Sequence, residues 1–204
     1  MTVSFLLVLT VLSGVIRFAG FNHYKTTHRV TVDENVYYSI AQQLLKDPLD
    51  YSARGFVERI DQDAHKHPYM STPLFKHPPL YSYLLALSLK LFADAPFAVI
   101  LISLISGCLL IPLVYFLARA VADEGTAVLA TLIMAADPVT MICSQKVWLD
   151  STLAFLVALA AFFFIKGMER RVFFIWAGLA AGLAALTKYR SEERRVGKEC
   201  RSRW

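Results

Sequence analysis

The chain has 204 residues, of which 56% are hydrophobic, and its mean hydropathy is +0.49. A soluble domain of this length needs a more polar surface, so the composition excludes an ordinary water-soluble protein and indicates a protein of the bilayer. The formal net charge is +5, and the three cysteines, Cys108, Cys143 and Cys200, have neither metal-ligand spacing nor the pattern of a disulfide framework.

The first apolar run covers residues 3–20 (VSFLLVLTVLSGVIRFAG) and is long enough to cross a bilayer if Arg17 extends to the headgroups. A signal peptide is the competing interpretation, but a basic start and a small-residue cleavage site are lacking. Residues 21–94 follow as an outer loop. Further spans are expected at 95–118, 125–145, 147–165 and 172–187. The chain is therefore predicted to be an all-α integral membrane protein, a multi-span helical bundle.

Residues 33–46 of the outer loop suit an amphipathic helix resting on the membrane. Its apolar residues recur at helical spacing: Val36, Ile40, Ala41 and Leu44. Asp33 and Glu34 stand at its start. Capping explains them in structural terms, because TVDE has the form of a capping box and carboxylates in a first turn suit the helix dipole.

A second apolar segment of the loop, residues 79–93, is about 22 Å long as a helix, which is short of the roughly 30 Å hydrocarbon core. Ser82, Ala86 and Lys90 give it a weakly polar stripe, so we expect it to lie in the interface. This places Arg119 and the KGMERR stretch at 166–171 in the cytoplasm, as the positive-inside rule requires. It also places five ionisable residues on the outer face: Asp33, Glu34, Lys76, His77 and Asp150.

Two short motifs in these regions have both a structural and a functional interpretation. In FKHPPLY (75–81), paired prolines at a helix start leave amide donors free beside Lys76 and His77, which suits a phosphate. Solvated basic residues before a proline-started helix explain the same motif. In VWLDS (147–151), Asp150 opens an apolar run and fits a plain N-cap equally well.

The chain ends in RSEERRVGKECRSRW (190–204), which breaks off the membrane pattern. This stretch resembles the translation of a sequencing-library adapter, so we expect it to be non-native. A basic cytoplasmic tail is the alternative. Without it, 15 basic and 13 acidic residues remain and the net charge falls to +2. We therefore expect no nucleic-acid partner.

The order of five short motifs resembles the GT-C class of glycosyltransferases. The motifs are the arginine near the end of the first span, the DE pair before two tyrosines, HPPLY, Trp-x-Asp and GLAALTKY. The closest pattern is the bacterial branch that is similar to protein O-mannosyltransferases and to the lipid A aminoarabinose transferase. The resemblance covers residues 1–189, which correspond to the N-terminal part of such a protein, and we expect the chain as given to be inactive.

The resemblance implies a bacterial inner-membrane enzyme that moves a sugar, with inversion, from a polyprenyl-phosphate donor to a lipid, glycan or protein acceptor on the outer face. Two juxtamembrane helices in the first outer loop, matching 33–46 and 79–93, bear its site. Asp33 matches the catalytic acid, Glu34 its neighbour and Asp150 the second acidic position. Lys76, His77 and Arg17 are the candidates for the donor phosphate, although His77 stands where the aminoarabinose branch often has lysine.

The chemistry agrees with these residue types. A carboxylate such as Asp33 can take the proton of an acceptor hydroxyl while the sugar–phosphate bond breaks, and cations stabilise the departing phosphate. Asp33, Glu34 and Asp150 also offer oxygen ligands to a divalent metal, and the metal requirement stays open. A transporter or flippase subunit is the alternative function, but its ionisable residues would be expected inside the membrane rather than in one loop.

Overall fold

The computed structural model describes residues 2–26, 32–55, 78–92 and 95–188. Within these ranges the chain is helical and contains no strand. The helices are α1 (Thr2–Thr26), α2 (Val32–Lys46), α4 (Leu80–Leu91), the 3-10 helix η3 (Pro96–Val99), α5 (Leu101–Val121), α6 (Glu124–Ala136), α7 (Pro138–Ser144), α8 (Asp150–Glu169) and α9 (Phe173–Ala185). The predicted all-α fold class is confirmed.

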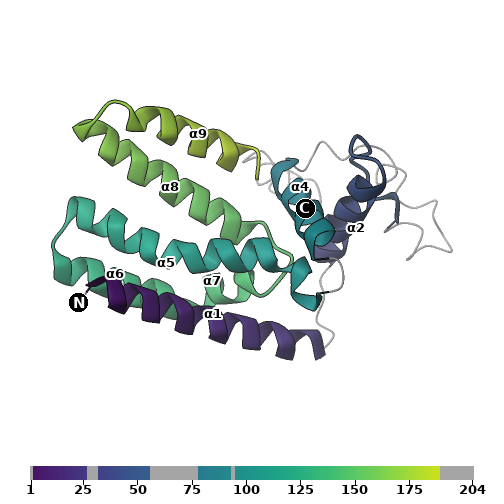
Figure 1. Cartoon of the computed structure of the whole chain (residues 1–204), viewed down its shortest axis with the longest axis horizontal. Coiled ribbons are helices and arrows are strands. Elements are labelled where there is room, and N and C mark those ends of the chain that lie inside the picture. Colours follow the sequence, from purple (N-terminus) through teal and green to yellow (C-terminus); the bar gives the residue numbers. More distant parts are fainter. Residues whose placement is uncertain (1, 27–31, 56–77, 93–94, 189–204) are drawn as a thin grey trace, which may run out of the picture.

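Helices α1, α5, α6, α8 and α9 lie side by side as a bundle, and α2 and α4 lie beyond one end of it (Figure 1). We call this end the loop end. The opposite end holds the two short turns at 122–123 and 170–172, and we call it the turn end. Among the described residues, three helices are long and apolar enough to cross a membrane: α1 over Val3–Asn22, α5 and α8. The bent pair α6 and α7 qualifies as a fourth when counted as one span.

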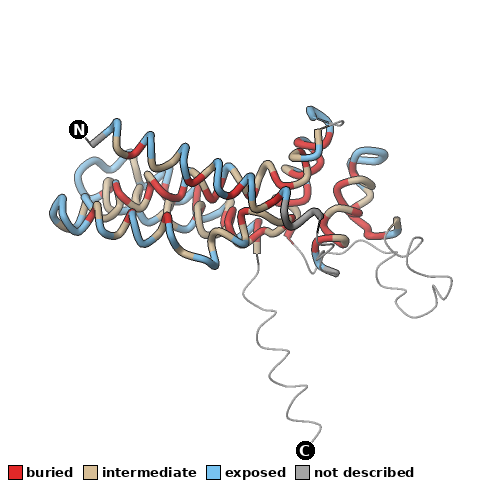
Figure 2. Tube along the Cα trace, turned by 90° about the horizontal axis from the view of Figure 1, so that it is seen from below, coloured by how far each residue is buried: buried red, intermediate tan, exposed pale blue. Residues whose placement is uncertain are grey.

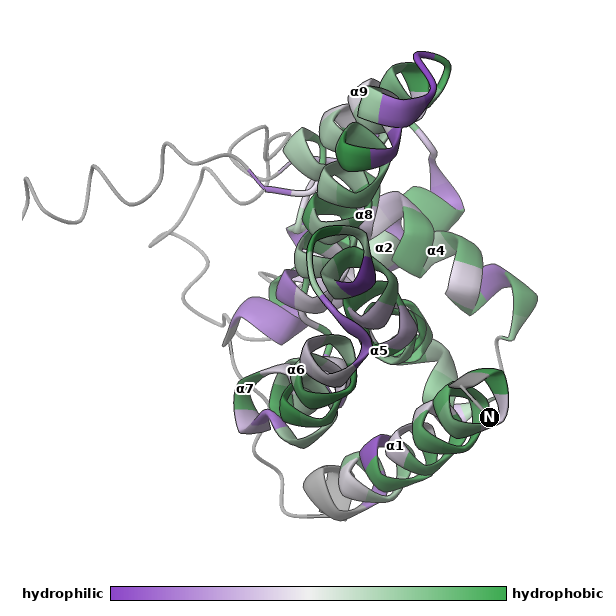
Figure 3. Ribbon diagram, turned by 90° about the vertical axis from the view of Figure 1, so that its left-hand side faces the viewer, coloured by the Kyte–Doolittle hydropathy of each residue, from purple (hydrophilic) through white to green (hydrophobic). Residues whose placement is uncertain are grey.

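The sides of the bundle are covered by exposed apolar residues (Figures 2 and 3). Examples from each helix are Val11, Val15, Ile105, Leu109, Ile133, Val157, Phe164, Ile175 and Leu179. Water would disfavour so much continuous apolar surface, whereas hydrocarbon matches it. The chain is therefore an integral membrane protein.

Helices α6 and α7 meet at a bend of 54°. Asp137 ends α6, and its Oδ2 accepts a 2.7 Å hydrogen bond from the Thr140 backbone N–H, while Pro138 occupies the first position of α7. The missing amide of proline is no loss at a helix start. Asp137 is therefore an N-cap at a break in the span.

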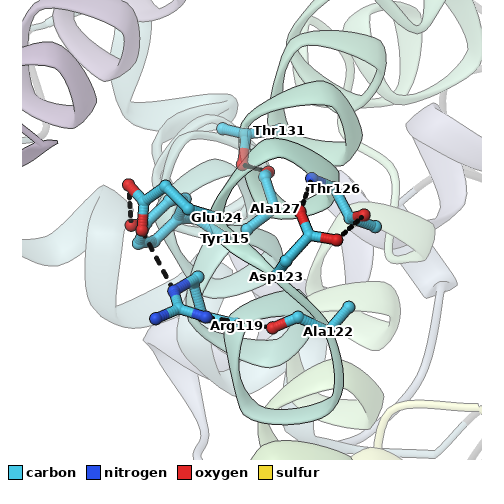
Figure 4. A network of polar contacts seen from close by, with 8 residues as sticks. All are labelled: Tyr115, Arg119, Ala122, Asp123, Glu124, Thr126, Ala127 and Thr131. Atoms are coloured by element: carbon cyan, nitrogen blue, oxygen red, sulfur yellow. Dashed lines mark hydrogen bonds and ion pairs between the residues drawn. The ribbon is translucent and has the colours of Figure 1, made fainter.

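The turn end is held by polar contacts between the end of α5 and the start of α6 (Figure 4). Arg119 Nε lies 3.0 Å from Glu124 Oε2, and the Tyr115 hydroxyl donates to Glu124 Oε1 at 2.8 Å. Asp123 caps α6 by accepting a 2.8 Å bond from the Thr126 N–H. This bond and a second one from the Thr126 hydroxyl at 3.1 Å hold the pKa of the Asp123 carboxyl below its ordinary value. The turn is therefore fixed by a cap and an ion pair.

The predicted apolar face of α2 is correct, because Val36, Ile40, Ala41 and Leu44 are all buried. That face lies against protein rather than lipid. The face packs in one cluster with Leu85 of α4 and with Val147 and Leu149 before α8. The neighbouring protein elements therefore cover the surface that the sequence pattern left for lipid.

The predicted polar stripe of α4 is only partly exposed. Ser82 and Ala86 are buried, and Tyr51 shares a 3.1 Å hydroxyl contact with Ser82. Lys90, the third residue of the stripe, is exposed together with Leu87 and Leu91. Small and polar residues pack toward α2 because they allow close approach, and the apolar side is left for lipid.

The glycine pair of α9, Gly178 and Gly182, is typical of close helix packing inside a membrane protein. In the described chain, however, a Cβ at either position meets nothing within 4 Å. The buried face of α9 is made by Ala177, Ala180 and Ala184.

Candidate active site

At the start of α2, the two neighbouring acids differ in their exposure to solvent. Asp33 is exposed, whereas the Glu34 side chain is buried and its Oε2 accepts a 3.3 Å hydrogen bond from the Val147 backbone N–H. This bond joins the first outer helix to the turn between α7 and α8. Thr31, the other half of the predicted capping box, lies outside the described residues. Glu34 thus has a tertiary contact that the capping interpretation does not include.

Asp150 begins α8 at the same end of the bundle. Its Oδ1 lies 3.0 Å from Nζ of Lys188, and its Oδ2 accepts a hydrogen bond from Nε1 of Trp148. Both oxygens of this carboxylate therefore have partners. Asp150 is consequently fixed in position and paired with a cation, which is more than the plain N-cap that its place in the sequence suggests.

A chain of hydroxyl contacts connects α4 to this turn. The Tyr81 hydroxyl lies 2.8 Å from Ser103 Oγ, and Ser103 Oγ donates to the Trp148 carbonyl at 2.8 Å. Burial raises the pKa of the Tyr81 hydroxyl above its ordinary value, with the Glu34 and Asp150 carboxylates adding to the rise. Tyr81 therefore stays protonated and uncharged. The relay fixes α4 and α5 to the backbone just before Asp150.

The start of α4 is bound to the end of α9. The Leu80 backbone N–H donates to the Leu186 carbonyl at 3.0 Å, and the Tyr83 N–H donates to the Pro79 carbonyl at 3.1 Å. The predicted availability of the amides at this helix start is therefore wrong for Leu80, because the residue after α9 supplies an acceptor, whereas the Tyr83 bond is an ordinary bond within the first turn of α4. Lys76 and His77 lie outside the described residues, so their predicted place at the donor phosphate stays a prediction.

Arg17 turns inward rather than toward the headgroups as expected. Its side chain is fully buried, and its Nε donates to Ser144 Oγ in α7 at 3.3 Å. Space for this contact exists because Gly107 of α5 lacks a side chain: a Cβ there would lie 2.0 Å from Ser144 Oγ. Within the described ranges neither terminal nitrogen of Arg17 has a hydrogen-bond partner. Arg17 therefore joins α1 to α7, and its predicted contact with the donor phosphate stays a prediction.

The described residues contain no group of three or more His, Cys, Asp or Glu side chains arranged to hold a metal ion. Asp33, Glu34 and Asp150 therefore do not form a three-carboxylate site in the part of the chain that is described.

The structure thus brings Glu34 and Asp150 to one turn, with Asp33 next to Glu34 at the start of α2. It adds three residues that the sequence analysis gave no role: Tyr81, Ser103 and Lys188. Lys188 had a weak signal, since it is the first ionisable residue after the apolar run at 172–187. Tyr81 stands in the HPPLY motif and Lys188 in GLAALTKY, but neither residue was given a role there. Ser103 had no signal, because a serine within an apolar helix is unremarkable in one sequence.

A family model described as dolichyl-phosphate-mannose-protein mannosyltransferase matches residues 76–191. The matched range includes Lys76, His77, Asp150 and Lys188, whereas Arg17, Asp33 and Glu34 precede it. No curated protein and no solved structure matches the chain.

Proposed function

The chain belongs to the dolichyl-phosphate-mannose-protein mannosyltransferase family, whose model matches more than half of its length, and is a membrane glycosyltransferase of the GT-C type; we propose that its donor is a polyprenyl-phosphate sugar. The sugar is transferred with inversion to an acceptor hydroxyl of a lipid, glycan or protein. The site lies at the loop end and faces outward from a bacterial inner membrane.

One contact gives this proposal its main support, namely the 3.3 Å bond from the Val147 N–H to Glu34. It ties the acid pair at the start of α2 to the segment that leads into Asp150. Residues that are more than a hundred positions apart therefore reach one end of the bundle. A structural membrane anchor would not need such convergence of acids with a tyrosine, a tryptophan and a lysine.

Asp33 is the proposed general base. It is exposed beside the anchored Glu34, so its carboxylate is open to an acceptor hydroxyl. The acceptor oxygen forms its bond to sugar C1 as the bond from C1 to the phosphate oxygen breaks, and the hydroxyl proton passes to Asp33. The bond electrons leave with the lipid phosphate. Because the described acids do not gather as a metal site, no step is assigned to a metal.

The departing phosphate gains negative charge as the bond breaks. Cationic side chains directed at that oxygen would lower the barrier, and they are more effective in a poorly hydrated interface than in water. Lys76 and His77 are proposed for this role because they immediately precede Pro78 and the start of α4.

The test is Asp33→Asn in the complete reading frame, with transfer of radiolabelled mannose from polyprenyl-phosphate mannose measured in purified membranes. We expect normal accumulation and a rate about 100-fold to 10,000-fold lower, as is typical for loss of a general base. Asp47→Asn is the matched control, because Asp47 is also an exposed acid and directly follows the other end of α2. A near wild-type rate for Asp33→Asn would show that Asp33 is only a helix-start residue.

A further inference from the structure

Asp150 and Lys188 form an ion pair in which, among the described residues, the carboxylate is bound on both oxygens and the ammonium by one hydrogen bond. The carboxylate is fixed on both oxygens, one by Lys188 at 3.0 Å and one by the Trp148 indole, and it stands at the first turn of α8. A negative charge is favoured there by the helix dipole. The carboxylate is therefore a rigid point to which the ammonium is attached.

The Lys188 ammonium has more N–H donors than its bond to Asp150 uses. An ammonium has three N–H groups, and within the part of the chain that is described its hydrogen bond is the one to Asp150. About 38% of its side chain is exposed. The ammonium is therefore positioned by a carboxylate and still open to an anion.

The location of Lys188 fits an anion of the proposed reaction. Lys188 stands two residues after Leu186, whose carbonyl accepts the Leu80 N–H at the start of α4. The same helix start follows Lys76 and His77 in the sequence. Two carboxylates, Glu34 and Asp150, are close enough to act on Tyr81. Since these acids would repel a phosphate, a phosphate-binding site beside them needs a fixed cation.

We propose that Lys188 binds the phosphate of the donor lipid and that Asp150 is a positioning residue that acts through Lys188. This rests on the proposed function. It changes the predicted role of Asp150 from an acid of the reaction or a metal ligand to the support of a cation.

The test measures equilibrium binding of polyprenyl phosphate to the purified product of the complete reading frame. Polyprenol of the same length is the comparison lipid, because it has the same tail and no phosphate. Lys188→Met is expected to weaken polyprenyl phosphate binding about 10-fold or more and to leave polyprenol binding unchanged, since a charge-assisted bond is lost and the apolar contacts are not. Lys188→Arg should stay within about 3-fold of wild type, because it keeps the charge and the donors.

Lys166→Met is the matched control. Lys166 also has a carboxylate partner at 3.0 Å, Glu169, and a similar exposed fraction of 34%, but it lies at the turn end. Its loss should not change binding of either lipid. Equal binding of polyprenyl phosphate by wild type and Lys188→Met would overturn the inference. So would binding of inorganic phosphate as tight as that of the lipid, because the site would then not be one for the donor.

Asp150→Asn separates positioning from an independent role. If Asp150 acts through Lys188, the variant should raise the donor KM about 3-fold to 10-fold with little change in kcat, because an unfixed lysine loses preorganisation. Asp150→Asn should then add nothing in a Lys188→Met background. Losses that multiply in the double variant would overturn the positioning role. If the wild-type protein binds no polyprenyl phosphate at all, the proposed function fails, and the result does not concern Lys188 alone.

Discussion

Glu34 accepts a hydrogen bond from the Val147 N–H across 113 residues of sequence, and this bond fixes the start of α2 against the turn before α8. Both residues are buried, so water cannot replace either partner readily. The bond makes Glu34 a structural residue of the site, next to Asp33, to which we assign the chemistry.

The first prediction follows from this bond. Glu34→Ala leaves the Val147 N–H buried without an acceptor and should lower the free energy of unfolding by about 1–3 kcal/mol. Glu34→Gln keeps an acceptor oxygen and should lower it by less than about 1 kcal/mol. Thermal unfolding of the purified protein in detergent measures both. An alanine variant as stable as wild type would show that the contact contributes nothing.

A second prediction concerns the Arg17–Ser144 contact, because replacing one partner should change stability differently from replacing the other. Ser144→Ala leaves the buried guanidinium without the acceptor of its Nε and should destabilise the protein by about 1–3 kcal/mol. Arg17→Met removes the charge and fills similar space, so stability should be retained or raised. Thermal unfolding tests both variants. The donor KM of Arg17→Met in the complete reading frame then decides whether Arg17 contacts the phosphate.

A third prediction uses the glycine that makes this contact possible. Gly107→Ala would place a Cβ 2.0 Å from Ser144 Oγ, so α5 and α7 must separate. We expect a loss of about 1–3 kcal/mol, as for other overpacked cores. Gly178→Ala is the control, because nothing lies within 4 Å of a Cβ there. Similar accumulation and melting temperatures for the two variants would contradict the packing of α5 on α7.

The fourth prediction tests which ends of the bundle share a side of the membrane. Single cysteines are placed at Leu49 and Met168, which are 88% and 75% exposed and lie at the loop end and the turn end, after replacement of the native cysteines. A membrane-impermeant thiol reagent added outside should label Leu49→Cys and not Met168→Cys. Labelling of both would mean that α4 crosses the membrane, which would separate Asp33 from Asp150.

The helical period was enough to predict which residues of α2 are buried, because Val36, Ile40, Ala41 and Leu44 mark one face whatever covers it. It was not enough to identify the cover, since Leu85 and Val147 lie far along the chain. For α4 the prediction was right for Lys90, which is exposed, and wrong for Ser82 and Ala86, which are buried. In a helix at a membrane surface, a polar stripe either meets water or packs against protein, and the period is the same for both.

In the candidate site, likewise, individual residues could be predicted from the sequence and their partners could not. Asp33, Glu34 and Asp150 were singled out because they match the acidic positions of the GT-C class that the sequence resembles. Their partners were not identified, because Lys188 is 38 positions from Asp150 and Val147 is 113 positions from Glu34. One sequence contains no signal for pairs at such separations. Only the packing of α8, α9 and the two outer helices brings them together.

The backbone bond from Leu80 to Leu186 also sets an order of events during synthesis. The Leu80 amide is made more than a hundred residues before its acceptor, which at roughly 5–20 residues per second is a delay of about 5–20 seconds. Through this interval α4 cannot dock against α9. The start of α4 therefore gains its partner only after α9 has been made, and a ribosome that stalls before residue 186 leaves a chain in which the Leu80 amide has no acceptor at residue 186.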